Sequence, residues 1–129
     1  MLVVDATVAL AASGADDGFD VLGDDLIAPP LMWSEARSVL HEMTWRGEVR
    51  PDDAATTRGR LEQCRVMRRS PARLGDEAWR LAEELGWAKT YDAEYVALAR
   101  LSHCRLVTLD ARLRRATARL GFVVGPTEL

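Results

Sequence analysis

Short apolar runs alternate along the chain with longer stretches in which apolar residues recur every three or four positions. The runs are typical of buried strands, and we expect strands at residues 2–4, 26–28, 66–67, 105–109 and 122–124. The longer stretches are typical of amphipathic helices, which we expect at residues 7–13, 31–46, 52–64, 76–85, 91–101 and 111–120. This alternation indicates an α/β fold, in which helices cover both faces of a parallel sheet.

The tryptophans follow the helical pattern. Spacing directs Trp79 inward, together with Ala82 and Leu85 of the same helix, and we expect core packing for three of the four tryptophans. Trp45 stands at the end of its helix, beside Arg46, and is open to stacking on a nucleobase.

Length and composition limit the class of protein. The 129 residues are 48% hydrophobic and 29% charged, which is typical of one globular domain spanning residues 1–129. No apolar stretch is long enough to cross a bilayer, and no basic segment opens the chain, so we expect neither a membrane anchor nor a signal peptide. Two cysteines are too few for a disulfide scaffold. We therefore expect a cytoplasmic protein.

Charge is unevenly distributed along the chain. Residues 1–36 hold seven acidic residues and no Lys or Arg, whereas residues 58–73 hold six Arg and one acid, and residues 111–119 four Arg and no acid. This segregation predicts an acidic pocket flanked by basic surface, which the formal net charge of −3 does not reveal. We expect the acids of the polar loop at residues 16–25 to be solvated and to flank that pocket.

Four acidic residues stand where ligands bind in parallel sheets, beyond the carboxyl ends of the strands. Asp5 and Asp110 follow predicted strands directly. Glu35 lies in about the first turn of the helix at residues 31–46, and Asp92 opens the helix at residues 91–101. Each one alone has a simpler interpretation: an Asp at such a position, Asp92 above all, is more often a helix cap than a ligand. The prediction of a site depends on the four together.

A bound cation would reconcile four neighbouring carboxylates, because like charges at close range raise one another's pKa. Oxygen ligands without a histidine or thiolate cluster favour Mg²⁺ or Mn²⁺ over Zn²⁺. Such a metal polarises a phosphoryl oxygen, lowers the pKa of an attacking water and orients it. The spacing leaves open whether one or two ions bind.

Four segments that contain these acids resemble the motifs of the PIN domain, and in order, spacing and length those of VapC-type toxins of bacterial toxin–antitoxin pairs. They are residues 1–7 (MLVVDAT), 34–35 (SE), 91–99 (YDAEYVALA) and 106–110 (LVTLD). The resemblance covers essentially the whole chain. It implies a Mg²⁺- or Mn²⁺-dependent endoribonuclease whose catalytic and metal-binding residues are Asp5, Glu35, Asp92 and Asp110. Thr7 and Thr108 match hydroxyl positions that accompany the first and last acids, and we expect them to orient those acids.

The resemblance also implies an architecture and partners. The fold would be an α/β/α sandwich around a parallel sheet, with a protruding helical clamp at about residues 50–66. The partners would be a second copy of the chain, a VapB-type antitoxin laid over the clamp, and a structured RNA such as a tRNA or rRNA loop. Arg112 stands where some relatives carry a further acid or polar residue, so we do not expect a fifth metal ligand from that loop.

Four arginines are candidates for contacts with RNA phosphates, at Arg68, Arg69, Arg112 and Arg115. Glu94 lies about 200° around its helix from Asp92, so we expect it to point away from the site and to pair with Arg100 or another neighbour.

Two further functional hypotheses stay open. One is a catalytically weak, PIN-like protein-binding module, although an intact set of four acids argues against a degenerate site. The other is a phosphotransferase-like enzyme with Asp5 as nucleophile. That chemistry usually needs a second acid two residues later, and Thr7 stands at that position.

Overall fold

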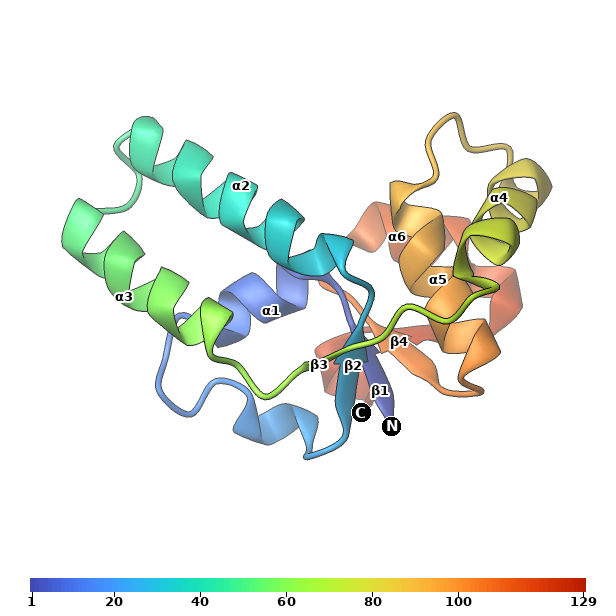
Figure 1. Ribbon diagram of the computed structural model, residues 1–129, viewed down its shortest axis with the longest axis horizontal. Helices are drawn as coiled ribbons and strands as arrows, with labels where there is room; N and C mark the ends of the chain where they lie inside the picture. The colour runs from blue at the N-terminus through green and yellow to red at the C-terminus, as the bar shows by residue number, and fades with distance from the viewer.

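The computed structural model describes all residues, 1–129, and is built on one five-stranded parallel sheet (Figure 1). The strands are β1 (Leu2–Val4), β2 (Leu26–Ala28), β3 (Met67–Arg68), β4 (Arg105–Val107) and β5 (Val123–Val124). They lie in the order β3-β2-β1-β4-β5, and all four pairings are parallel. In the central strand, Val3 pairs with Ile27 on one side and with Leu106 on the other. The prediction of an α/β fold with a parallel sheet is confirmed.

Six α-helices connect the strands. They are α1 (Ala6–Ala12), α2 (Leu31–Trp45), α3 (Pro51–Glu62), α4 (Leu74–Leu85), α5 (Tyr91–Leu101) and α6 (Ala111–Ala116), and short 3₁₀ turns stand at Asp20–Leu22, Ala118–Leu120 and Pro126–Glu128. In Figure 1, α1, α2 and α3 lie on one side of the sheet and α4 and α5 on the other. The sheet is thus sandwiched between helical layers, as the resemblance implies.

The observed bounds of several elements differ from the predicted ones, and two of these differences have a clear local cause. The helix expected at residues 111–120 ends at Ala116, because the chain turns at Thr117 and continues as a 3₁₀ turn. The strand expected at residues 105–109 ends at Val107, because the hydroxyl of Thr108 accepts the N–H of Asp110 at 3.0 Å and curls the chain into a turn. No helix of the chain is long and apolar enough to span a membrane.

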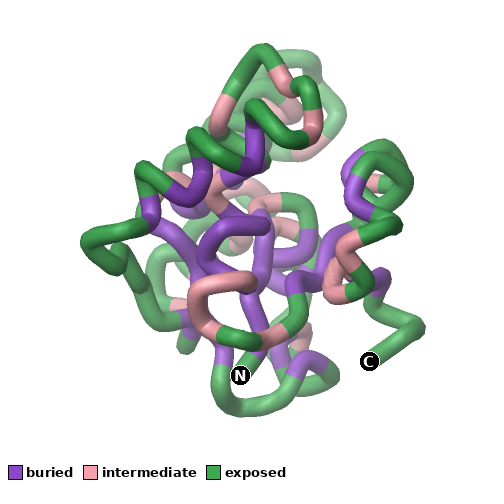
Figure 2. The backbone as a smooth tube through the Cα atoms, turned by 90° about the vertical axis from the view of Figure 1, so that its right-hand side faces the viewer, coloured by how far each residue is buried: buried purple, intermediate pink, exposed green.

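The core lies between the sheet and the helices on each side, where Figure 2 shows the buried residues concentrated. Val3, Ile27 and Leu106 of the neighbouring strands are completely buried. Helix α5 contributes five consecutive buried residues, Tyr95–Ala99, since it packs against both β1 and β4. This helix is therefore fixed in the middle of the molecule, and its first turn reaches the sheet edge described below.

The prediction for Trp79 is wrong. Its side chain is 64% exposed, because the inward stripe of α4 consists of Leu74, Ala78, Leu81 and Ala82. Trp79 lies one position beyond Ala78 and so points off this stripe. Trp33 is buried and Trp87 packs partly against the core, as expected, whereas Trp45 is 82% exposed.

Helices α2 and α3 form an antiparallel hairpin that extends away from the sheet, at the left of Figure 1. We call this hairpin the arm. It agrees with the predicted clamp, but it includes the outer half of α2 as well as α3. An ion pair between Arg37 and Glu62 at 2.7 Å joins the two helices near the sheet, and Trp45 lies at the far end of α2.

Candidate active site

The carboxyl ends of the strands face α2, α5 and α6, and we call this side of the sheet the carboxyl edge. Asp5 directly follows β1, Asp110 follows the turn after β4, Glu35 lies in the second turn of α2, and Asp92 is the second residue of α5. The structure brings these four acids near one another. Burial raises the pKa of Glu35 and of Asp92 most; the charges of Asp92 and Asp5 add to the effect on Glu35, and those of Asp110 and Asp5 to the effect on Asp92.

Asp5 is the most buried of the four, with 4% of its surface exposed, and its carboxylate is held by neutral donors. Oδ1 accepts the hydroxyl of Thr7 at 2.6 Å and the N–H of Val8 at 3.1 Å, and Oδ2 accepts the hydroxyl of Thr108. Burial raises the pKa of Asp5, and these hydrogen bonds only partly offset that effect. The orientation of the carboxylate is therefore fixed without any cation of the protein.

The two threonines also tie the elements of the site together. Besides donating to Asp5, Thr7 accepts the N–H of Leu109 at 3.0 Å, and Thr108 accepts the N–H of Asp110 at 3.0 Å. The two hydroxyls thus connect the start of α1 to the turn after β4, although Thr7 and Thr108 lie 101 residues apart in the sequence. This arrangement has the geometry that an orienting role needs.

Glu35 is held by Tyr95, whose hydroxyl donates to Glu35 Oε1. Burial and the neighbouring carboxylate raise the pKa of Tyr95 well above its usual range, so this phenol remains a donor. Burial is also the largest cause of the raised pKa of Glu35. Sequence reasoning missed Tyr95, although it lies three residues after Asp92 and therefore on the same helix face.

The expectation for Glu94 is wrong. Glu94 is half-buried, burial raises its pKa, and it lies close enough to Glu35 for its charge to raise the pKa of Glu35. Arg100 pairs instead with Glu77 at 3.3 Å and Glu84 at 3.5 Å. The 200° separation from Asp92 holds, but the first turn of α5 lies at the carboxyl edge, and Glu94 is near enough to Glu35 there for its charge to act on it.

Two of the four acids, Asp5 and Asp110, cap helices. Asp92, for which a capping role was the simpler interpretation, does not. Asp5 accepts the N–H of Val8 at the start of α1, and Asp110 Oδ1 accepts those of Arg112 and Leu113 at 2.9 and 3.3 Å at the start of α6. Asp92 makes no capping hydrogen bond, since Thr90 occupies the cap position of α5. Partial burial, then the charges of Asp110 and Asp5, raise the pKa of Asp92. Asp92 thus has no structural partner.

The donor set of the carboxyl edge suits a hard divalent cation. All the donors are carboxylates, and none of the four forms an ion pair with Lys or Arg. No three acidic, histidine or cysteine side chains are close enough together to form a ready-made metal site. The carboxylates would therefore have to turn towards a cation, and Asp92, free of hydrogen bonds, is the one best able to do so.

The acids of the loop at residues 13–25 do not flank this edge, which corrects the expectation for them. The loop leads to the amino ends of the strands, where Asp25 pairs with the ammonium of Met1 at 3.4 Å. Asp16 pairs with Arg60 at 2.8 Å and Asp20 with Arg65 at 3.2 Å, which joins the loop to α3 and to the segment after it. Only Asp5 and Glu35 of the seven acids in residues 1–36 belong to the carboxyl edge.

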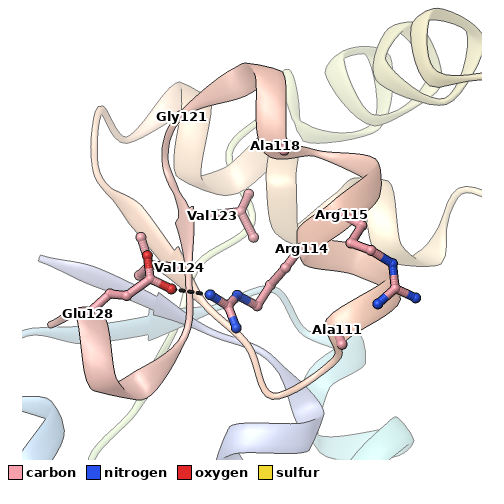
Figure 3. Close-up of a pocket in the computed structure, with 8 residues that line it drawn as sticks. All are labelled: Ala111, Arg114, Arg115, Ala118, Gly121, Val123, Val124 and Glu128. Atoms are coloured by element: carbon pink, nitrogen blue, oxygen red, sulfur yellow. Dashed lines mark hydrogen bonds and ion pairs between the residues drawn. The ribbon is translucent and has the colours of Figure 1, made fainter.

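The four arginines predicted to contact RNA form no ion pair. Arg68 lies over the ring of Trp33, 4.5 Å from its centroid, and Arg69 follows β3 at the carboxyl edge. Arg112 and Arg115 are exposed on α6. Figure 3 shows that the Arg115 guanidinium points away from Glu128, whereas the neighbouring Arg114 pairs with it. These four guanidinium groups are thus available to an external anion.

Comparison with known proteins identifies the fold and the group. The family model of the PIN domain matches residues 2–118. The chain is 34% identical over 116 residues to ribonuclease VapC9 of Mycobacterium tuberculosis, and equally to VapC ribonuclease Mb0985 of Mycobacterium bovis, covering 88% of each chain in both cases.

Two solved structures are similar over nearly the whole chain. PAE2754 from Pyrobaculum aerophilum matches 98% of this chain and 90% of its own, with a TM-score of 0.77 and 26% identity. A toxin–antitoxin complex from Klebsiella pneumoniae matches 98% of each chain, with a TM-score of 0.65 and 19% identity, and so supports the fold. Together with the sequence relatives, these matches show that the chain belongs to the PIN-domain family, among its VapC-type members.

Proposed function

We propose that the protein is a divalent-metal-dependent endoribonuclease that acts as the toxin of a toxin–antitoxin pair. The observation that carries the proposal is the cluster of Asp5, Glu35, Asp92 and Asp110 at the carboxyl edge, where four acids face one another without a cationic side chain. Such a cluster costs folding free energy unless it serves an external cation. The ribonuclease names of the VapC relatives support the same conclusion.

The residues of the site have separate roles in this proposal. Asp5, Glu35, Asp92 and Asp110 would hold Mg²⁺ or Mn²⁺, which would stabilise charge on the phosphodiester and lower the pKa of a water for in-line attack. Thr7 and Thr108 orient Asp5, and Tyr95 orients Glu35. Arg68, Arg69, Arg112 and Arg115 would bind phosphates on either side of the scissile bond, giving affinity without sequence selection.

The substrate that fits this open edge is a loop of a structured RNA, such as a tRNA or rRNA loop. A loop exposes an unpaired backbone that can bend into a shallow acidic site, whereas the A-form duplex holds its phosphates in a rigid double strand.

We also propose that the chain forms a homodimer. The partner that fits the arm is an antitoxin. A groove of about 420 Å³ lies between α2 and α3. Its lining includes the apolar Leu40, Pro51 and Ala54 and two arginines, of which Arg37 pairs with Glu62 and Arg58 forms no ion pair. An amphipathic helix with acidic flanks would fit this groove. A basic side chain that followed the helix towards the carboxyl edge would occupy the place of the metal and so inhibit the enzyme.

The test is cleavage of total bacterial RNA by the purified chain with Mg²⁺ or Mn²⁺, with EDTA, and with Asp5→Asn. The matched control is Asp17→Asn, which neutralises an exposed acid in the loop at residues 13–25 that forms no ion pair. We expect discrete fragments from the wild type and from Asp17→Asn, and none with EDTA or Asp5→Asn. If the wild type and Asp5→Asn were equally inert, and calorimetry showed no divalent-metal binding, the protein-binding module would be the better interpretation.

A further inference from the structure

A pocket of about 460 Å³ opens beside the acidic cluster, between α2 and the connection from α4 to α5. Its lining includes Glu35 and Asp92 of the acidic cluster together with Trp87, Lys89 and Tyr91. Figure 1 shows this connection above the carboxyl edge, across from the base of the arm. The volume lies in the range of sites for small organic ligands, roughly 300–1,000 Å³, which is suitable for one nucleotide.

The wall of this pocket is held in place before any ligand binds. Helix α4 ends at Gly86, whose φ of +71° is the left-handed conformation that glycine adopts without strain. The next N–H, that of Trp87, donates to the carbonyl of Ala82 at 2.8 Å, and the indole packs partly against the core. The connection therefore presents Lys89 and Tyr91 from a fixed support.

Lys89 is the only lysine among the 17 basic residues, and its charge has no partner in the chain. Its side chain is exposed and forms no ion pair, although Glu35 and Asp92 line the same pocket. A free ammonium group beside an acidic cluster suits a ligand that carries its own negative charge, and a flexible lysine binds a phosphate as a point charge.

Tyr91 is also without a structural role. Its side chain is 58% exposed and its hydroxyl makes no hydrogen bond within the chain, in contrast to the buried Tyr95 one turn later. An exposed aromatic ring next to a cation and beside a proposed cleavage site is the arrangement that proteins use to stack an unpaired base.

We propose that this pocket holds the unpaired nucleotide adjacent to the scissile phosphodiester, with its base stacked on Tyr91 and its phosphate against Lys89. The inference rests on the proposed function, because it places the pocket relative to the cleaved bond. It also adds a requirement for the substrate: the RNA must have at least one unstacked base next to the cleaved bond. Tyr91 and Lys89 set the affinity for that nucleotide.

The test measures binding of a fluorescein-labelled, single-stranded adenosine pentaribonucleotide by anisotropy, in an Asp5→Asn background that prevents cleavage. We expect Tyr91→Leu to weaken binding roughly 5- to 100-fold, the range of one base–aromatic stack. Tyr91→Phe, which keeps the ring, should bind like the parent. Trp79→Leu, which removes a similarly exposed aromatic ring from α4, should also bind like the parent.

Lys89 has its own readout, the salt dependence of binding. Lys89→Gln should lower the slope of log Kd against log salt concentration by about 0.7, the value for one phosphate contact on a single strand, and Lys89→Arg should preserve it. A purely structural role of Lys89 would not change this slope. An unchanged slope in Lys89→Gln would overturn the phosphate contact.

Cleavage kinetics of the otherwise wild-type chain separate this inference from the proposed function. A wild type that cleaves RNA while Tyr91→Leu binds and cleaves equally well would overturn the pocket and leave the ribonuclease. A wild type that cuts no RNA, with binding still sensitive to Tyr91→Leu but not to Trp79→Leu, would overturn the reaction and support the pocket. Equal losses in Tyr91→Leu and Trp79→Leu would show nonspecific stacking and overturn the pocket.

Discussion

The acidic residues at the two ends of the sheet differ in whether a basic group of the chain neutralises their charge. In the loop at residues 13–25, Asp16, Asp20 and Asp25 each pair with a cation of the protein. At the carboxyl edge, Asp5 and Glu35 are held only by neutral hydroxyl and N–H donors. The first arrangement joins loop, arm and chain terminus, whereas the second leaves negative charge uncompensated. The difference separates acids whose charge is neutralised within the chain from acids whose charge, under the proposed function, is neutralised by a metal ion.

The largest expected effect contrasts the two ends directly. Glu35→Gln keeps the oxygen that accepts from Tyr95 but removes a charge from the carboxyl edge, and we expect the single-turnover cleavage rate to fall at least ~100-fold. Asp20→Asn removes a charge from the loop, and its rate should stay within about two-fold of wild type. If the cleavage rate fell equally in both variants, the acids at the two ends of the sheet would not differ in their importance for the reaction.

The second effect concerns the hydroxyl network. Thr108→Val keeps the shape of a completely buried side chain, but it deprives the Asp110 N–H of its acceptor and Asp5 of a donor. We expect a loss of about 1–3 kcal/mol in the free energy of unfolding, measured by urea denaturation. Thr56→Val on the exposed face of α3 is the control and should change it by less than about 0.5 kcal/mol. A Thr108→Val protein as stable as this control would contradict the network.

The third effect is a pH dependence of stability without metal. The pKa values of Asp5, Glu35 and Asp92 are raised in the folded protein, so protonation favours folding. The thermal midpoint in EDTA should therefore rise as pH falls from 7 towards 5, and fall as pH increases through the raised pKa values.

Two further measurements sharpen that experiment. Saturating Mg²⁺ should raise the midpoint more at pH 7 than at pH 5, because more of the carboxylates are charged at the higher pH, and so flatten the profile. Glu35→Gln, which removes one of the titrating groups, should show a smaller rise in EDTA than the wild type. A midpoint in EDTA that fell steadily from pH 7 to 5 would show that the carboxyl edge carries no electrostatic strain.

The smallest effect belongs to the paired acids. Asp20→Asn breaks an exposed ion pair, while Arg65 keeps its hydrogen bonds to the carbonyls of Phe19 and Gly23, both at 2.7 Å. We expect the free energy of unfolding to fall by less than about 1 kcal/mol, measured by urea denaturation. A larger loss would mean that the loop depends on this charge more than its exposure suggests.

Sequence patterns predicted the fold closely, because four of the five strands contain a short apolar run and glycine or proline stands near many of the boundaries. The failures have local causes. Trp79 is hydrophobic but lies beside the inward stripe of α4, which small residues complete. Glu77 is buried because Arg80 and Arg100 pair with it, a compensation between α4 and α5 that no periodicity within one helix reveals.

The candidate site was predictable where topology alone decides position, as for Asp5 after β1 and Asp110 after β4. It was not predictable where side chains from different elements meet. The contact between Tyr95 and Glu35 joins residues 60 positions apart, and the proximity of Glu94 to Glu35 depends on how α5 crosses the sheet. The pairing of the loop acids with Arg60 and Arg65 likewise required the position of α3.

The central position of β1 in the sheet has a consequence for folding of the chain during synthesis on the ribosome. Val3 can pair with Ile27 early in synthesis, but its other neighbour, Leu106, is made only when about four fifths of the chain exists. The hydroxyl of Thr108 and the carboxylate of Asp110 arrive later still. A nascent or truncated chain that ends before β4 therefore lacks the partner strand and part of the acidic cluster. Such long-range pairing slows folding, and it also means that the acidic cluster is complete only when translation of the chain is almost finished.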